Sequence, residues 1–231
     1  MVKAFRALYH RAMFYQAKHS MDPESGQGMT EKRSGGCLRS LLEFIGVIVV
    51  AGVLAWAITT FVVQPYEIPS GSMEDTIEVG DRVLSEKISC YFGEPKAGDI
   101  VTFEAYEDPL TDDIYTTRED APETVRGRLE EKVLIKRVIA TAGQTVTLED
   151  GYVYVDGRRL SEPYTDGEPS YPLADSSLSF PYTVPEGEIW VMGDNRTNSK
   201  DSRFFGGVPV ENVTGHAFWR YWPLDRFGGL G

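Results

Sequence analysis

The hydrophobic residues of the chain form one long uninterrupted run, followed by a series of short alternating runs. The long run covers residues 44–63, contains 20 residues without a charge and shows no amphipathic period. A helix of that length is about 30 Å long, which matches the hydrocarbon core of a bilayer. A buried helix of a soluble protein is the alternative, and the absence of an amphipathic period argues against it. The pattern therefore predicts a transmembrane helix over residues 41–63.

The charges on the two sides of this run predict its orientation. The run begins after 43 residues and is longer than the apolar region of a cleaved signal peptide, so we interpret it as a permanent anchor. Residues 1–40 carry seven Lys/Arg and three acidic residues, whereas residues 64–231 carry 16 basic and 31 acidic residues. Because basic flanks stay in the cytoplasm, we expect residues 1–40 to be a disordered cytoplasmic tail and residues 64–231 an exported domain of a single-pass cell-membrane protein. Such an acidic domain repels phosphate, so we expect no nucleic-acid partner.

The short runs after the anchor alternate as β-strands do. Turn-forming residues separate them, and no helix of ordinary length is predicted after residue 63. The predicted strands lie within residues 81–89, 98–103, 132–143, 145–148, 152–155, 187–195 and 216–224. Strands this short need barrel-like closure or two packed sheets, so the predicted fold is mainly β, after a single N-terminal transmembrane helix.

Residues 104–131 interrupt this pattern with ten acidic residues and three arginines. A long unstructured loop is unusual inside a compact domain. We interpret the segment as a solvated surface insertion, and an acidic recognition arm is the alternative.

The turn PSGSM, residues 69–73, places two serines in irregular backbone on the exported side of the anchor. It could be a linker, or it could present a nucleophile, which would need a neighbouring base. His10 and His19 lie on the cytoplasmic side of the predicted anchor. His216 lies in an aromatic run, where a packed or surface histidine is the simpler interpretation.

Lys136 is the other candidate base, because it stands in the apolar sequence VLIKRVIA. On a strand it would share a face with Leu134 and Val138, while Arg137 would occupy the opposite face. If one face lies in the core, one of these two cations is buried, and burial lowers the pKa of a lysine. The alternative is that both charges reach solvent from an edge strand.

The polar segment MGDNRTNSKDSRFFGG, residues 192–207, favours the first interpretation. Asp194, Arg196, Asp201 and Arg203 could form alternating ion pairs that fix this loop. Ser199 would then be a hydroxyl able to orient a neutral lysine amine.

Five fragments, in order after the anchor, resemble the successive boxes of type I signal peptidases: PSGSM, GDRV, GDIVTF, KRVIATAG and GDNRTNSKDSR. The resemblance covers residues 40–222. It implies a membrane-anchored serine endopeptidase with a signal-peptidase-type catalytic domain. It also implies removal of signal peptides from exported preproteins, with cleavage after small residues of the Ala-x-Ala type through an acyl-enzyme. The expected partners are these preproteins, the lipid bilayer and the secretion translocon, and no metal or other cofactor is expected.

The resemblance also assigns roles to residues of this chain. Ser72 would be the nucleophile and Lys136 the general base, with Ser70 and the Ser72 amide as the oxyanion hole. Ser199 would hydrogen-bond the lysine amine, and Asp201 and Arg203 would pair to support the loop. The expected substrate pocket consists of Tyr66, Ile68, Met73, Ile77, Leu134 and Ile135. The chain departs from the family pattern at Asp75, Gln144 and Thr197.

Other classes explain these features less well. A self-cleaving repressor-type peptidase would lack the anchor and carry a DNA-binding domain. A Ser-x-x-Lys enzyme fails, because Asp75 and Met73 stand three residues after Ser72 and Ser70. A sortase-like enzyme would use Cys90, and its surroundings show no sign of that. An anchored β-domain that binds exported proteins without cutting them is the non-enzymatic alternative.

Overall fold

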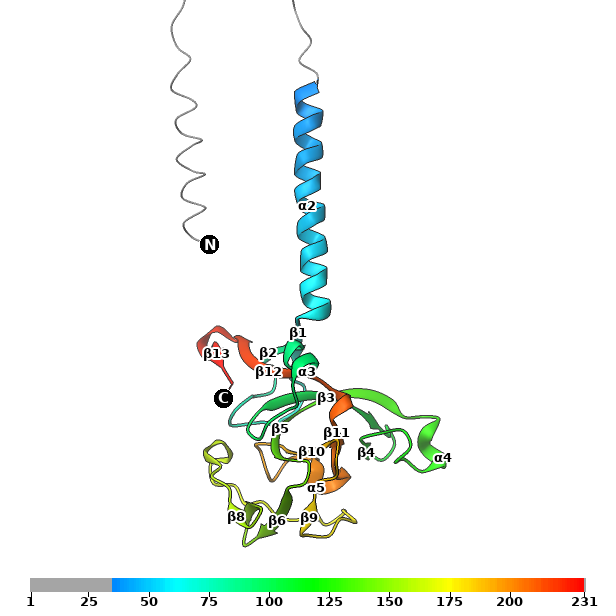
Figure 1. Ribbon diagram of the computed structural model, residues 1–231, viewed down its shortest axis with the longest axis vertical. Helices are drawn as coiled ribbons and strands as arrows, with labels where there is room; N and C mark the ends of the chain where they lie inside the picture. The colour runs from blue at the N-terminus through cyan, green and yellow to red at the C-terminus, as the bar shows by residue number, and fades with distance from the viewer. Residues whose placement is uncertain (1–34, 231) are drawn as a thin grey trace, which may run out of the picture. The chain divides into compact units, whose positions relative to one another are not determined.

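The computed structural model describes residues 35–230, beginning with the apolar helix α2 (Gly35–Phe61) (Figure 1). Within it, Arg39–Phe61 is long and apolar enough to cross a membrane, with a mean hydropathy of 2.5. The prediction placed the end of this helix at residue 63, but Val63 already begins strand β1. Residues 35–40, which were assigned to the disordered tail, are helical, and residues 1–34 of that tail lie outside the described residues.

The rest of the described chain forms two antiparallel sheets, with only short helices. The larger sheet has nine strands in the order β1-β2-β12-β3-β5-β10-β11, with β4 paired to β3 and β13 paired to β12. Its strands are β1 (Val63–Glu67), β2 (Arg82–Glu86), β3 (Ile100–Glu107), β4 (Ile114–Tyr115), β5 (Glu130–Thr141), β10 (Glu188–Met192), β11 (Val208–Pro209), β12 (Val213–Trp222) and β13 (Gly228–Gly229). The smaller sheet has the order β8 (Arg158–Arg159), β7 (Tyr152–Val155), β6 (Thr145–Glu149) and β9 (Tyr182–Thr183). The predicted mainly β fold is confirmed, in its two-sheet form.

The short helical segments occupy the connections between strands. They are α3 (Ile88–Phe92), α4 (Glu123–Arg126), α5 (Ser202–Phe205) and the 3-10 turns η1 (Pro163–Thr165), η2 (Val210–Asn212) and η3 (Leu224–Arg226). Each predicted strand segment contains a strand, although β2 is shorter than predicted because α3 follows it at once.

The two sheets meet through one hydrophobic cluster. Trp190 and Met192 of β10 and Ile139 of β5 are buried against Val146 and Val153 of the smaller sheet. Another cluster includes Ile135 in the middle of β5, together with Ile68, Met73, Ile77, Val83, Ile100, Ala217 and Leu230. This second cluster anchors the segment that follows β1, where the candidate nucleophile lies.

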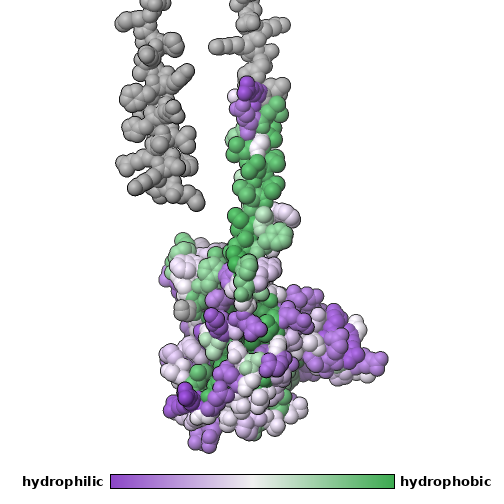
Figure 2. Space-filling view, viewed as in Figure 1, coloured by the Kyte–Doolittle hydropathy of each residue, from purple (hydrophilic) through white to green (hydrophobic). Residues whose placement is uncertain are grey.

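The acidic insertion is a folded segment with a hydrophilic surface. Strand β3 extends to Glu107, β5 begins at Glu130, and residues 108–129 between them, called the arm below, contain β4 and α4. Ala121, Val125 and Leu129 are buried together in the arm, with Tyr106 and Tyr115 packed against them. Figure 2 shows that the visible outer surface of the arm is hydrophilic, so its charges are solvated while its few apolar residues form a small core.

Candidate active site

Ser72 lies in a turn after β1 that is held in the protein core on one side. The next residue, Met73, and Ile77 are both fully buried, and the Ile77 amide donates a 2.7 Å hydrogen bond to the Met73 carbonyl. Burial of each such side chain contributes about 1.5–3 kcal/mol. Two apolar anchors thus fix the backbone immediately after the serine.

Asn195 holds the other side of the same turn. Its side-chain amide donates to the Gly71 carbonyl at 3.0 Å, and its backbone N–H donates to the Ser72 carbonyl at 3.3 Å. Thr76, four residues after the serine, donates to the buried Asp194 carboxylate at 2.6 Å. The serine is therefore presented on a rigid turn tied to the loop that follows β10.

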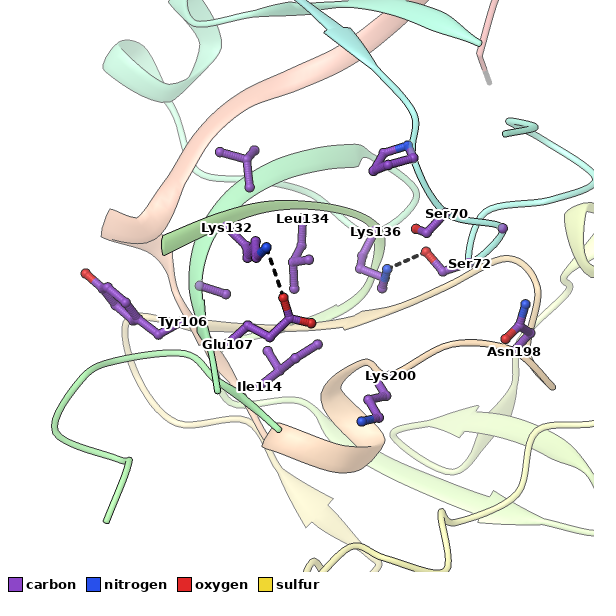
Figure 3. A pocket seen from close by; sticks show the side chains of 14 residues that line it. Ser70, Ser72, Tyr106, Glu107, Ile114, Lys132, Leu134, Lys136, Asn198 and Lys200 are labelled. Carbon is purple, nitrogen blue, oxygen red and sulfur yellow. Dashed lines mark hydrogen bonds and ion pairs between the residues drawn. The ribbon is translucent and has the colours of Figure 1, made fainter. Parts of the chain in front are cut away.

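Lys136 on β5 reaches this serine. Its Nζ atom lies 2.6 Å from Ser72 Oγ and 3.0 Å from the Ile135 carbonyl, and the residue is only 3% exposed (Figure 3). Strand β3 pairs with β5 along this stretch, whereas β10 begins to pair with β5 only at Arg137. Lys136 thus stands where one edge of β5 is open, and its amine points to the serine.

Lys136 and Arg137, the adjacent cations of β5, are both buried, which the sequence did not predict. The sequence prediction placed one of Lys136 and Arg137 in the core, but Arg137 is also only 5% exposed. It donates to the two carboxylate oxygens of Asp194 at 2.9 and 2.7 Å, and its guanidinium lies 4.0 Å from the centre of the Tyr164 ring. Because these partners compensate the Arg137 charge, the opposite face of the strand can be buried as well, and the alternative of two solvent-exposed cations is excluded.

Among the described residues, no carboxylate or aromatic ring compensates the charge of Lys136 in the way that Asp194 and Tyr164 compensate that of Arg137, and the pKa of the lysine amine is lowered as a result. It forms no ion pair within the described residues, and burial lowers the pKa of its amine to about 8. The Asp201 and Asp194 carboxylates act in the opposite direction, while the Arg203 charge adds to the decrease. A substantial fraction of the amine is therefore neutral near physiological pH, as a base must be.

The loop from Gly193 to Arg203 contains one of the predicted internal ion pairs. Asp201 and Arg203 are 2.9 Å apart and buried, and the Asp201 carboxylate also accepts the Gly193 amide at 3.0 Å. Asp194 and Arg196, in contrast, pair outside the loop. Asp194 binds Arg137, and Arg196 binds Glu162 at 2.5 Å. The loop is therefore fixed by one internal ion pair and by ion pairs to residues that are distant in sequence.

Ser199 does not form the predicted hydrogen bond to the lysine. Its hydroxyl is buried and has no hydrogen-bond partner among the described residues. It lies close to the site all the same, because a Cβ atom on Gly193 would be 2.3 Å from Ser199 Oγ and 2.4 Å from the Ser72 carbonyl oxygen. Glycine at position 193 is thus needed for close packing of the serine turn against this loop.

A cavity of about 360 Å³ opens beside Ser72 and Lys136. Ser70 lies on its wall next to Ser72 (Figure 3). The lining residues are Pro69, Ser70, Gly71, Ser72, Ala105, Tyr106, Glu107, Ile114, Lys132, Val133, Leu134, Lys136, Asn198 and Lys200. Of the predicted pocket residues only Leu134 belongs to this set.

The other five predicted pocket residues do not line this cavity. Ile68, Met73, Ile77 and Ile135 are members of the hydrophobic cluster beneath the serine turn, and Tyr66 packs against that cluster. Their apolar character serves to hold the turn. The cavity wall instead includes Ile114 of the arm and charged residues at the ends of β3 and β5, which the sequence prediction missed.

The three departures from the family pattern are accommodated locally. Asp75 adopts a positive φ of 79° in the serine turn, a conformation that aspartate tolerates better than most residues. Gln144 accepts a hydrogen bond from the Thr141 amide at 2.9 Å, and Thr197 donates one to Glu168 at 3.0 Å.

His216 lies half-buried near Glu86 and Asp99 and does not line the cavity, so its interpretation as a non-catalytic histidine agrees with the structure.

The site thus combines a serine hydroxyl, a buried amine in contact with it and an open cavity. An acyl-transfer hydrolase needs these as its nucleophile, its base and its substrate-binding site. Comparison with known proteins identifies the family. The protein-family model described as "Signal peptidase, peptidase S26" matches residues 41–222 of this chain. The chain therefore belongs to the signal peptidase family, and the predicted activity, a signal peptidase I hydrolase that removes signal peptides, is confirmed.

Individual relatives agree with the family match. A probable signal peptidase I-1 of a Synechocystis species is 41% identical and covers 82% of this chain and 86% of its own. The signal peptidase I of Leptolyngbya laminosa is 39% identical, and the match covers 83% of this chain and 84% of the relative. The signal peptidase I of Mycobacterium tuberculosis is also 39% identical, and the match covers 82% of this chain and 75% of the relative.

Proposed function

We propose that the chain cleaves signal peptides with a dyad in which Ser72 is the nucleophile and Lys136 the general base. The observation that carries this proposal is the 2.6 Å separation of Ser72 Oγ from an amine that is buried and unpaired among the described residues. In its neutral form the amine accepts the hydroxyl proton as Ser72 attacks the scissile carbonyl. The resulting ammonium then protonates the leaving amine, and water releases the acyl-enzyme.

The negative charge of the tetrahedral intermediate needs hydrogen-bond donors beside Ser72. We propose that the Ser70 hydroxyl and the Ser72 amide supply them, since Ser70 lies on the same wall of the cavity. The Asp201–Arg203 pair supports the loop that packs on the serine turn. Ser199 would act on the lysine only after its hydroxyl turns toward the amine, because no such hydrogen bond exists in this structure.

Substrate selection is proposed to follow from the size of the cavity. The cavity measures about 360 Å³, and Leu134 lines it two residues before Lys136, so we propose small side chains such as alanine at the positions −1 and −3 relative to the cut. We further propose that α2 anchors residues 64–231 on the outer face of the cell membrane as a catalytic domain. There the domain would meet preproteins in the bilayer as they leave the translocon. Anchoring both enzyme and substrate in one membrane reduces the orientational entropy that cleavage must overcome.

The test is cleavage of a purified preprotein by the detergent-solubilised full chain. Wild-type protein should release the mature chain, and Ser72→Ala should abolish release while the melting temperature changes by only a few degrees. Cys90→Ser serves as the matched control, because this half-buried side chain lies outside the cavity. Release by Ser72→Ala at the wild-type rate would refute the nucleophile, and full activity of Lys136→Ala would refute the base.

A further inference from the structure

The first residues of the arm, 108–113, form a well-fixed turn beside the catalytic cavity. The backbone N–H of Asp108 donates to the Asp113 carbonyl at 2.9 Å, and that of Asp112 donates to the Asp108 carbonyl at 2.8 Å. The Asp108 carboxylate is almost fully buried and accepts from two nitrogens of Arg128, one of them at 2.7 Å. Residues 108–113, which connect β3 to β4 and are called the arm tip below, are therefore rigid.

This tip holds a lysine of the opposite loop. The ammonium of Lys200 donates a 2.8 Å hydrogen bond to the Asp112 carbonyl, and Lys200 lines the cavity together with Ser72 and Lys136 (Figure 3). A backbone carbonyl carries no net charge, and Lys200 forms no ion pair within the described residues. Two of its three N–H donors are thus left for another acceptor.

Apart from Lys136 of the dyad, the other charges of the cavity wall are compensated. Lys132 lies 3.2 Å from Glu107 and 3.3 Å from Glu130, so its charge is neutralised by the cavity's own carboxylate. Arg137 and Arg203, behind the wall, have Asp194 and Asp201 as partners. Lys200 therefore gives the cavity an uncompensated positive charge, although the domain of residues 64–231 carries 31 acidic and only 16 basic residues.

We propose that Lys200, held in place by the arm, is a specificity-determining residue that binds an acidic side chain within the first three residues after the cut. This inference rests on the proposed Ser72–Lys136 cleavage. The acid is assigned to the mature side because the residues before the cut must be small at two positions and lead into an apolar segment. A carboxylate there would oppose both requirements.

Peptide cleavage by the full chain tests this assignment. The substrates are peptides with one Ala-x-Ala site and Glu, Gln or Lys at position +1, +2 or +3. The wild type should favour Glu over Gln at one of these positions by about 1.5- to 5-fold in kcat/KM, the range expected for a solvent-accessible ion pair. The preference should disappear at about 1 M salt, where the Debye length is about 3 Å.

Charge reversal gives the decisive comparison. Lys200→Glu should favour the Lys peptide over the Gln peptide at the same position, and Lys200→Arg should keep the preference for Glu. Lys96→Ala is the control, because Lys96 is exposed and lies outside the cavity wall. Arg128→Ala, which frees the arm tip without changing the wall, should weaken the preference for Glu while Gln peptides are still cut.

The outcomes separate the two proposals. Equal rates for Glu, Gln and Lys peptides at all three positions, with cleavage that still depends on Ser72, would overturn the role of Lys200 alone. A preference for Glu that persists in Lys200→Glu would do the same. Cleavage that is independent of Ser72 would instead refute the proposed dyad.

Discussion

Replacing Lys136 by methionine should stabilise the fold at pH 7 while it abolishes catalysis. Burial lowers the pKa of this amine from 10.5 to about 8, so the folded chain binds its proton more weakly than the unfolded chain does. The difference corresponds to about 3 kcal/mol of stability lost below pH 8. Methionine has a similar unbranched shape and no charge, so it removes this penalty without leaving a large cavity.

The sign of the pH dependence identifies the cause. Between pH 8 and 10.5 the unfolded chain holds a proton that the folded chain has released, so wild-type stability rises with pH through this window relative to the methionine variant. Urea unfolding of the detergent-solubilised chain should show a gap of about 3 kcal/mol at pH 7 and roughly half of that at pH 9.5. A variant that is less stable than the wild type at pH 7, or a gap that does not change with pH, would refute the reasoning.

The same pKa governs activity. With a pKa of about 8, the neutral fraction of Lys136 rises about tenfold between pH 7 and 9, and kcat/KM for a preprotein peptide should rise by the same factor. Lys136→Met should lose about 10²–10⁴-fold in kcat, the usual contribution of a general base. A profile with its inflection near pH 6.5 would indicate a histidine base instead.

Three further substitutions test the surroundings of the dyad. Ser70→Ala should lower kcat by about 10²–10³-fold, with little change in the melting temperature, because it removes one oxyanion donor from an exposed side chain; an unchanged kcat would exclude that role. Ser199→Ala should leave stability unchanged or slightly raised, since the buried hydroxyl has no partner among the described residues. If Ser199 orients the amine during the reaction, the same variant loses about 10- to 100-fold in kcat, and wild-type kcat would remove it from the mechanism. Asp194→Asn should lower the free energy of unfolding by about 3–5 kcal/mol, because it leaves the buried Arg137 charge unpaired. The control is Asp225→Asn, at an exposed position. Equal stability of the two variants would contradict the role of Asp194 as the partner of Arg137.

Local sequence was sufficient where the determining contacts are local. The strands were predictable because apolar residues alternate along them, and Lys136 stood out because three apolar residues stand on each side of the Lys136-Arg137 pair. The two-residue strands β4, β8, β9, β11 and β13 are defined only by their pairing and carry no such pattern.

The errors at the site arise from contacts between distant segments. The burial of Arg137 depends on Asp194, 57 residues away, and the position of the serine turn depends on Asn195. The apolar residues near Ser72 were assigned to a pocket because sequence does not show which side of a turn faces the core. The secondary structure of the arm was not predicted, because residues 104–131 carry ten acidic residues and show no strand or helix pattern.

The way the arm is joined to the sheet has a consequence for evolution. Its two ends leave β3 and β5 at Glu107 and Glu130, which are directly paired, so β3 and β5 pair up to the base of the arm. Ala121, Val125 and Leu129 form a cluster within the arm, apart from the main core. Such a segment can be lengthened, shortened or exchanged as a cassette between relatives without disturbing the chemistry at Ser72. Exported proteins of different sequence could then be served by swapping this one module, while the catalytic scaffold is inherited intact.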